Sequence, residues 1–282
     1  MISPPFILAR RFVAGPDPES AIAAGRQLHA RGIRATFDLL GEDVLDREAA
    51  VRSAEANKQL LRRIPSEIER NISIKLTMFG LDISEEFCRE NVAGLLDTAR
   101  EVGGFVRIDM EGSKHTQQTL DLFHRLREAY DNVGIVLQAY LHRTPADVKE
   151  AIARGDRVRL CKGAYREPPE VAHQEMEHIR KAYRELAHQL LDHGNYPAIA
   201  THDEILVRDT LGYASVQKIP ADRFEFQMLY GLRPRRWDEL VAAGHRVRVY
   251  VPYGTHWFPY FYRRLRERRE NIYFVLRNLF GG

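Results

Sequence analysis

Charged and hydrogen-bonding side chains alternate with apolar ones along several short segments of this chain. Arg107 and Asp109, for example, alternate with Val106 and Ile108. Adjacent residues of a β-strand point to opposite sides of its sheet, so one side of each segment would be apolar and the other polar. The polar positions are Asp38, Ser73, Lys75, Thr77, Arg107, Asp109, Gln138, Arg157, Arg159, Glu225, Gln227, Arg248 and Tyr250.

Burying unpaired charge costs several kcal/mol per ion, so these groups must pair with one another or meet a polar ligand. One interpretation is an internal ion-pair network that only fills the interior. The other is a deep polar site at the C-terminal ends of the strands, where barrel enzymes hold their active sites. The residues expected near such ends are Lys75, Asp109, Gln138, Arg159, Lys162 and Tyr250.

A second candidate group lies near the C-terminus. Tyr260, Arg263, Arg264 and Glu267 are spaced three and four apart and would share one face of a helix. Two neighbouring guanidinium groups on a helix suit a carboxylate, which Arg binds in a bidentate manner. The alternative is a solvated basic surface. The position of this helix after the last strand, over the expected barrel mouth, favours the carboxylate site.

A third candidate is the segment Arg159-Leu-Cys-Lys-Gly-Ala-Tyr165. Gly163 would allow a ligand to approach the backbone closely. Lys162 could pair with a phosphate or an anionic ring. The sequence holds no dinucleotide-binding glycine fingerprint, no Walker A motif, no nucleophile elbow and no zincin helix. We expect no metal: Cys88 and Cys161 are far apart, and the strand-end His202 has no second histidine in a matching position.

The elements that would position these residues alternate regularly along the chain. Strands are expected at 33–39, 72–77, 105–110, 134–139, 157–162, 198–202, 224–229 and 247–251. Helices are expected at 18–30, 46–64, 84–102, 116–130, 146–154, 170–191, 204–211 and 235–243, with a last one from near His256. Strand–helix alternation implies a parallel sheet, and eight repeats predict a closed (β/α)8 TIM-like barrel. It would have an extra N-terminal helix and a last helix over its mouth, with 1–282 as one domain.

The overall composition is that of an ordinary soluble protein. The 282 residues are 44% hydrophobic and 29% charged, which suffices for a large core. The net charge of +3 gives no indication of nucleic-acid binding. No apolar run reaches the roughly 18 residues of a membrane span, and the N-terminus is a poor signal peptide. We therefore expect a cytoplasmic protein.

With these residues in place, the chain resembles proline dehydrogenase, the flavoenzyme of proline catabolism, in its short monofunctional bacterial form. Nine blocks match in order along the chain and include every expected strand. They are 37–42 (FDLLGE), 72–76 (ISIKL), 107–111 (RIDME), 137–140 (LQAY), 159–165 (RLCKGAY), 200–202 (ATH), 224–229 (FEFQML), 250–254 (YVPYG) and 260–267 (YFYRRLRE).

The resemblance implies FAD-dependent oxidation of L-proline to 1-pyrroline-5-carboxylate by hydride transfer to the flavin. The electrons would pass to a quinone, which implies peripheral contact with the inner face of the membrane. A 1-pyrroline-5-carboxylate dehydrogenase would act downstream, on the way to glutamate.

The resemblance also implies roles for particular residues. Arg263, Arg264 and Lys75 would approach the proline carboxylate, and Asp109 would belong to the polar shell around it. Tyr250, Tyr260 and Leu229 would wall the substrate. Glu42 would pair with Arg263 and gate the site, and Arg159 would lie close to flavin N5. The residues lining the FAD would be Met110, Gln138, Lys162, Gly163, Ala164, Thr201 and His202. No residue is assigned as proton acceptor for the proline amine.

Two other functions stay open on the residues alone. One is a flavin-free barrel lyase or aldolase, in which Lys75 or Lys162 forms a Schiff base with a carbonyl substrate. The other is a non-catalytic module that binds an acidic partner through the Arg-rich last helix.

Overall fold

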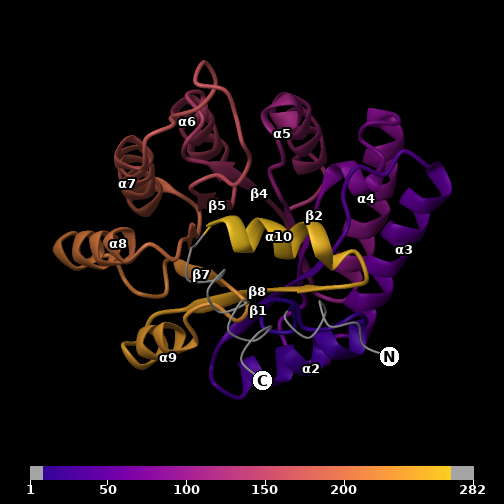
Figure 1. Cartoon of the computed structure of the whole chain (residues 1–282), viewed down its shortest axis with the longest axis horizontal. Helices are drawn as coiled ribbons and strands as arrows, with labels where there is room; N and C mark the ends of the chain where they lie inside the picture. Colours follow the sequence, from indigo (N-terminus) through magenta and orange to yellow (C-terminus); the bar gives the residue numbers. More distant parts are fainter. Residues whose placement is uncertain (1–8, 268–282) are drawn as a thin grey trace.

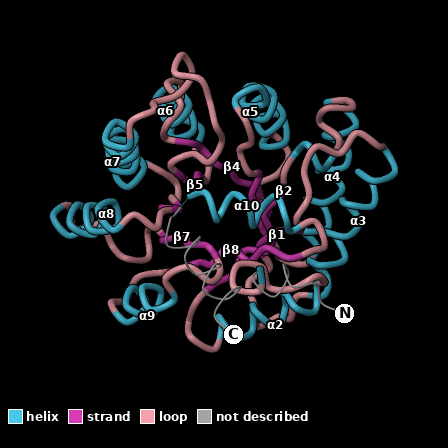
Figure 2. Tube along the Cα trace, in the orientation of Figure 1, coloured by secondary structure: helices cyan, strands magenta, loops and turns pink. Residues whose placement is uncertain are grey.

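The computed structural model describes residues 9–267, and their side chains as far as Tyr262. Eight parallel strands close into a barrel in sequence order, with β1 paired to both β2 and β8. Figures 1 and 2 show the helices as a ring around these strands. The predicted TIM-like barrel is therefore confirmed. The assignment of all 282 residues to one domain stays a prediction.

The strands are short and lie close to their predicted positions. They are β1 (Arg34–Leu39), β2 (Asn71–Ile74), β3 (Phe105–Ile108), β4 (Val133–Gln138), β5 (Val158–Cys161), β6 (Ala198–Ala200), β7 (Glu225–Leu229) and β8 (Val247–Tyr253).

The helices follow the strands in alternation. They are α2 (Pro18–His29), α3 (Arg47–Arg63), α4 (Glu85–Glu101), α5 (Ser113–Arg127), α6 (Thr144–Arg154), α7 (Met176–His193), α8 (Glu204–Val216), α9 (Pro234–Ala242) and α10 (Trp257–Glu267), with a 3₁₀ turn η1 (Leu76–Phe79). None of the helices in residues 9–267 is long and apolar enough to cross a membrane.

The first and last helices have special positions. In a regular barrel the eighth helix would cover the outside of β8, but here α10 crosses the barrel mouth (Figure 1). The extra helix α2 packs against β1 and β8 instead, and so covers the seam where the barrel closes. Asp17 caps α2, because its side chain accepts a hydrogen bond from the backbone N–H of Ser20.

The apolar side of each strand faces the helices, as the alternation predicts. Ile72, Val106, Val247 and Val249 are completely buried in the main hydrophobic cluster between barrel and helices. Full burial of such side chains contributes roughly 1.5–3 kcal/mol each. The polar side is thereby directed into the barrel lumen, where Arg107, Glu225 and Arg248 are almost wholly buried.

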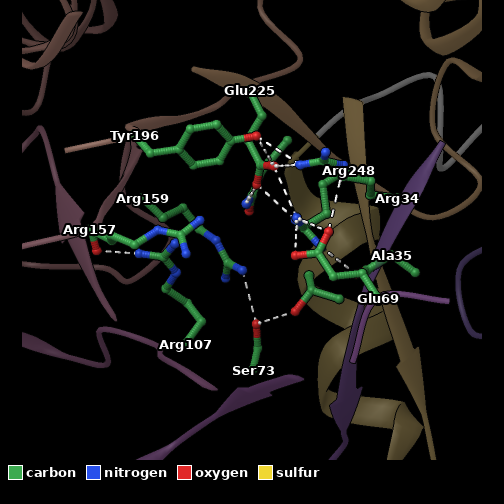
Figure 3. Close-up of polar contacts among 12 residues, drawn as sticks. Arg34, Ala35, Glu69, Ser73, Arg107, Arg157, Arg159, Tyr196, Glu225 and Arg248 are labelled. Atoms are coloured by element: carbon green, nitrogen blue, oxygen red, sulfur yellow. Dashed lines mark hydrogen bonds and ion pairs between the residues drawn. The ribbon is translucent and has the colours of Figure 1, made fainter. Parts of the chain in front are cut away.

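Ion pairs fill the foot of this lumen, at the N-terminal ends of the strands. Arg248 Nε lies 2.8 Å from Glu225 Oε1, and Arg248 Nη2 lies 2.9 Å from Glu69 Oε1. Arg34 reaches the same two carboxylates at 3.6–3.7 Å. Figure 3 shows this network on one side of the lumen and three further arginines on the other. The interpretation as an internal ion-pair network is thus correct for the foot of the barrel.

Several predicted boundaries are wrong, and three of these differences change where a residue of interest lies. β2 ends at Ile74, and Thr77 lies in η1, where its hydroxyl donates to Glu111 instead of entering the lumen. The long helix starts at Met176 and not at 170, because residues 171–173 pair with the loop after β4 instead: the His142 N–H donates to the Val171 carbonyl and the His173 N–H donates to the Tyr140 carbonyl. β6 ends at Ala200, so Thr201 and His202 follow it on a loop.

Candidate functional site

A cavity of about 590 Å³ opens at the C-terminal ends of the strands. Strands β4 to β8, the segments that follow β2 to β7, and helices α7 and α10 supply its walls. The predicted site residues that line it are Lys75, Asp109, Met110, Gln138, Arg159, Lys162, Gly163, Ala164, Thr201, His202, Leu229, Tyr250 and Tyr260. Most of the residues chosen from the sequence therefore converge on one hollow space.

A network of charged groups forms the floor of the cavity. Arg159 Nη1 donates to Asp109 Oδ1 at 2.8 Å, and the Tyr250 hydroxyl donates to Asp109 Oδ2, also at 2.8 Å. Lys75 Nζ lies 3.1 Å from Asp38 Oδ1 and 3.9 Å from Asp109 Oδ2. Asp109 is thus a shared acceptor that fixes the Arg159 guanidinium and the Tyr250 phenol on either side of it.

The environment fixes the protonation states of these groups. Burial lowers the pKa of Lys75, but the Asp38 and Asp109 carboxylates outweigh burial and raise the pKa above its usual value. Burial, together with the Asp109 and Asp38 charges, raises the pKa of Tyr250. At neutral pH, Lys75 is therefore an ammonium and Tyr250 a neutral phenol. A Schiff base requires a neutral amine, so Lys75 is poorly suited to the aldolase reaction.

The other wall of the cavity combines backbone groups with polar side chains. Gln138 Nε2 donates to the carbonyl of Glu111 at 2.9 Å, and Lys162 Nζ lies 3.1 Å from Asp203 Oδ2. His202 Nε2 accepts a hydrogen bond of 2.9 Å from the backbone N–H of Leu229. This bond places the proton of a neutral His202 on Nδ1. In residues 9–267 no cluster of His, Cys, Asp and Glu could hold a metal ion.

Gly163 is required by the shape of this wall. Its φ of +123° lies in a region that favours glycine. A Cβ atom there would lie 2.3 Å from the ring of Tyr140, which itself donates a hydrogen bond to the Tyr165 carbonyl. The missing side chain therefore lets the loop after β5 lie directly against the ring of Tyr140.

We expect Gly163→Ala to lower the free energy of unfolding by about 2 kcal/mol, because the new methyl group collides with Tyr140. Urea unfolding measures this change. Gly155→Ala is the matched control: Gly155 also has a positive φ, of +68°, but a Cβ there meets nothing within 4 Å. Equal losses in the two variants would show that backbone strain, and not the contact with Tyr140, is the cause.

Some residues of the cavity were not among the predicted site residues. Tyr140, Tyr165, His173 and Met176 line it. The sequence pattern placed His173 on a helix, but it precedes α7 on a loop, where its backbone N–H donates to the Tyr140 carbonyl at 2.8 Å. Asp38 also belongs to the charged floor, where it pairs with Lys75. Its place among the polar strand positions could have identified it as a site residue from the sequence.

Three predicted residues do not appear among the walls. Glu42 lies on the loop between β1 and α3 and is partly buried. Arg263 and Arg264 belong to α10, but their side chains lie outside the described residues. Tyr260, one turn earlier on α10, is 6% exposed and lines the cavity. The face of α10 that carries Tyr260 is therefore directed toward the site.

The closed parallel barrel with a charged cavity at its C-terminal end defines a (β/α)8-barrel enzyme. A family model described as proline dehydrogenase matches residues 21–277. The chain is 41% identical over 272 residues to proline dehydrogenase 1 of Bacillus subtilis subsp. natto, covering 96% of this chain and 90% of that protein. It is 37% identical over 284 residues to the proline dehydrogenase of Deinococcus radiodurans, covering 98% and 91%.

A solved structure agrees with these relatives. Proline utilization A (PutA) from Bdellovibrio bacteriovorus, inactivated by N-propargylglycine, superposes with a TM-score of 0.84 at 27% identity. The match covers 92% of this chain and 32% of the longer PutA chain. The chain belongs to the proline dehydrogenase family. It is an oxidoreductase that oxidises proline in proline catabolism, and its full-length relatives are monofunctional proline dehydrogenases.

Proposed function

We propose that the cavity holds FAD and that the protein oxidises L-proline to 1-pyrroline-5-carboxylate. The observation that carries this proposal is the convergence of Lys75, Asp109, Arg159 and Tyr250 on one cavity. Its charged floor suits a small zwitterion, and the wall after β5 and β6 suits a larger ring system. Arg159 is 5% exposed and its Nε has no hydrogen-bond partner among the described residues, so a buried donor is available at the cavity for a ligand.

The residues that would hold the flavin are Met110, Gln138, Lys162, Gly163, Ala164, Thr201 and His202. The flavin, when bound, supplies the acceptor for the hydride, which carries both electrons of the oxidation. Gly163 lines the cavity on the loop after β5, where the flat ring would lie close to its backbone. Lys162 and Arg159 supply positive charge where negative charge develops during hydride transfer.

The substrate would lie between this ring and α10. Its oxidation removes a hydride from C5 and a proton from the amine, giving the C=N bond of the product. We propose that Lys75, Arg263 and Arg264 hold the carboxylate. Tyr250, Tyr260 and Leu229 would enclose the ring and exclude water.

Asp109 and Arg159 have separate roles in this proposal. Asp109 orients Arg159 and Tyr250 through its two hydrogen bonds of 2.8 Å. Arg159 stabilises the charge of the transition state. Glu42, on the loop after β1, would gate the site through Arg263.

A purified sample tests the function directly. We expect a yellow protein whose flavin absorbance is bleached by L-proline in the absence of oxygen, with formation of the pyrroline product. A colourless protein that cannot be reconstituted with FAD would refute the cofactor. Borohydride trapping of a substrate–lysine adduct would favour the aldolase alternative, and salt-sensitive binding of polyanions without colour would favour the acidic-partner module.

We further propose that a quinone reoxidises the flavin and that a 1-pyrroline-5-carboxylate dehydrogenase consumes the product. Because quinones dissolve in the bilayer, a cytoplasmic protein with peripheral contact to the inner face of the membrane fits this acceptor. Activity with a soluble quinone, measured with and without lipid vesicles, tests both parts.

We expect Arg264→Ala to raise the KM for proline by roughly 30-fold or more, because loss of a charged partner of a carboxylate costs at least about 2 kcal/mol. Steady-state kinetics with a dye acceptor measure this, and bound flavin should be unchanged. Arg266→Ala, off the helical face shared by Tyr260 and Arg264, is the control and should leave KM within about twofold. An unchanged KM in Arg264→Ala would exclude the carboxylate contact.

A further inference from the structure

Arg107 is a buried arginine of the lumen that the reaction described above does not use. It stands on β3 and is 2% exposed. Its neighbour across the β3–β4 pairing is Gly134, where a Cβ atom would lie 2.5 Å from Arg107 Nη1. The missing side chain lets the guanidinium pass over β4. Arg107 Nη1 then donates to the carbonyls of Ile135, at 3.2 Å, and Arg157.

No carboxylate forms an ion pair with Arg107 among the described residues. Its other neighbours are the ring of Phe105, 5.1 Å away, further arginines and, without an ion pair, the Glu225 carboxylate. Burial lowers the pKa of Arg107 well below its usual value, the charges of Arg159 and Arg157 lower it further, and the Glu225 carboxylate offsets only part of this decrease. Because a guanidinium keeps its proton in proteins, Arg107 is a buried cation that is hydrogen-bonded to backbone carbonyls and only partly compensated by Glu225.

The lumen as a whole carries more positive than negative groups. Figure 3 shows Arg107, Arg157 and Arg159 gathered opposite the Glu225–Arg248 pair. The cations of the lumen and its foot are Arg34, Lys75, Arg107, Arg157, Arg159 and Arg248, and the anions are Asp38, Glu69, Asp109 and Glu225. Arg159 lies between Arg107 and the cavity, because its own guanidinium contacts Asp109 and Ser73.

A buried cation that is only partly compensated is costly, and its field extends through a low-dielectric interior beyond the groups that it touches. The reaction itself can then supply the negative charge that compensates Arg107. Proline brings a carboxylate into the cavity, and hydride transfer adds one negative charge to the acceptor. Both events place negative charge above Arg159, on the side away from Arg107.

We propose that Arg107 is a positioning residue that holds the lumen at positive potential and thereby favours the reduced, more negatively charged state of the site. This inference rests on the proposed flavin function. Arg107 acts on the site through its electric field and through the neighbouring Arg159, and it touches neither substrate nor cofactor. Gly134 is part of the same arrangement, because any side chain at this position would displace the Arg107 guanidinium.

The test is the two-electron midpoint potential of the bound flavin in Arg107→Gln, with Arg107→Met as a second neutral variant. We expect the equilibrium constant for reduction to fall about tenfold, which is about 30 mV for a two-electron couple. Arg107→Lys, which keeps the charge, should retain most of the wild-type potential. Arg26→Met removes a charge from an exposed arginine of α2 and should leave the potential unchanged.

Several outcomes would overturn the inference. An unchanged potential in a folded neutral variant would do so, as would an equal fall in Arg107→Lys. If neither neutral variant folds while Arg107→Lys does, the charge serves the fold and the proposal is wrong. Thermal stability that rises with chloride in the wild type but not in Arg107→Gln would show a bound anion as the counter-charge. The proposed function itself is judged separately, by bleaching of the wild-type flavin with L-proline.

Discussion

Arg159→Met should slow reduction of the flavin by L-proline about 10²- to 10³-fold, the usual cost of removing one preorganised donor from a developing charge. Proline binding should weaken less than about fivefold, because Lys75 and the arginines of α10 remain. Stopped-flow mixing without oxygen separates the two quantities. The limiting rate of bleaching reports the chemical step, and its half-saturation reports binding.

The contacts of Asp109 allow Arg159 to be replaced without leaving a buried carboxylate unpaired. Without Arg159, Asp109 keeps the Tyr250 hydroxyl at 2.8 Å and the Lys75 ammonium at 3.9 Å, so its carboxylate is not left unpaired. Arg159→Lys is the matched control, since it keeps the charge but loses the fork that reaches both Asp109 and Ser73. We expect it to recover part of the rate. Equal effects on rate and binding in Arg159→Met would argue against a role at the flavin.

The largest effect on stability is expected at the foot of the barrel. Arg248→Met should lower the free energy of unfolding by about 3–5 kcal/mol, because it leaves Glu225 buried without its main counter-charge. Glu225 is 2% exposed and cannot recover that loss from water. Urea unfolding at pH 7 measures the change. The double variant Glu225→Gln/Arg248→Met also removes the unpaired Glu225 charge. It should recover at least half of the lost free energy of unfolding. No recovery would show that packing, and not charge, is lost.

The same pair should make stability depend on acid pH. Burial would raise the pKa of Glu225, but the Arg248 guanidinium outweighs burial and lowers the pKa to about 2. The unfolded state then binds the proton first as the pH falls. Stability from this group is complete above the unfolded pKa of about 4.3 and is lost toward pH 2, on the order of 3 kcal/mol in all. Glu225→Gln should lack this part of the acid transition, and an identical acid profile would contradict the assignment.

Much of the fold could be predicted because strand alternation has a period of two. Val247 and Val249 on one side of β8 and Arg248 and Tyr250 on the other leave one arrangement that buries the apolar side against helices. The convergence of Lys75, Asp109, Arg159 and Tyr250 follows from closing such strands into a cylinder. Boundaries were less predictable where another interaction competes, as in the segment before α7 that bonds to residues 140–142, or in the 3₁₀ turn that holds Thr77.

The sequence by itself therefore determined the barrel, the family and many of the cavity residues, because these depend on residue type, order and periodicity. Only the tertiary structure decided which charges pair. Asp109 binds Arg159 and Tyr250, Asp38 binds Lys75, and Arg107 is left to backbone carbonyls. Pairing depends on distances across the lumen between strands that are far apart in the chain, and no spacing in the sequence encodes those distances.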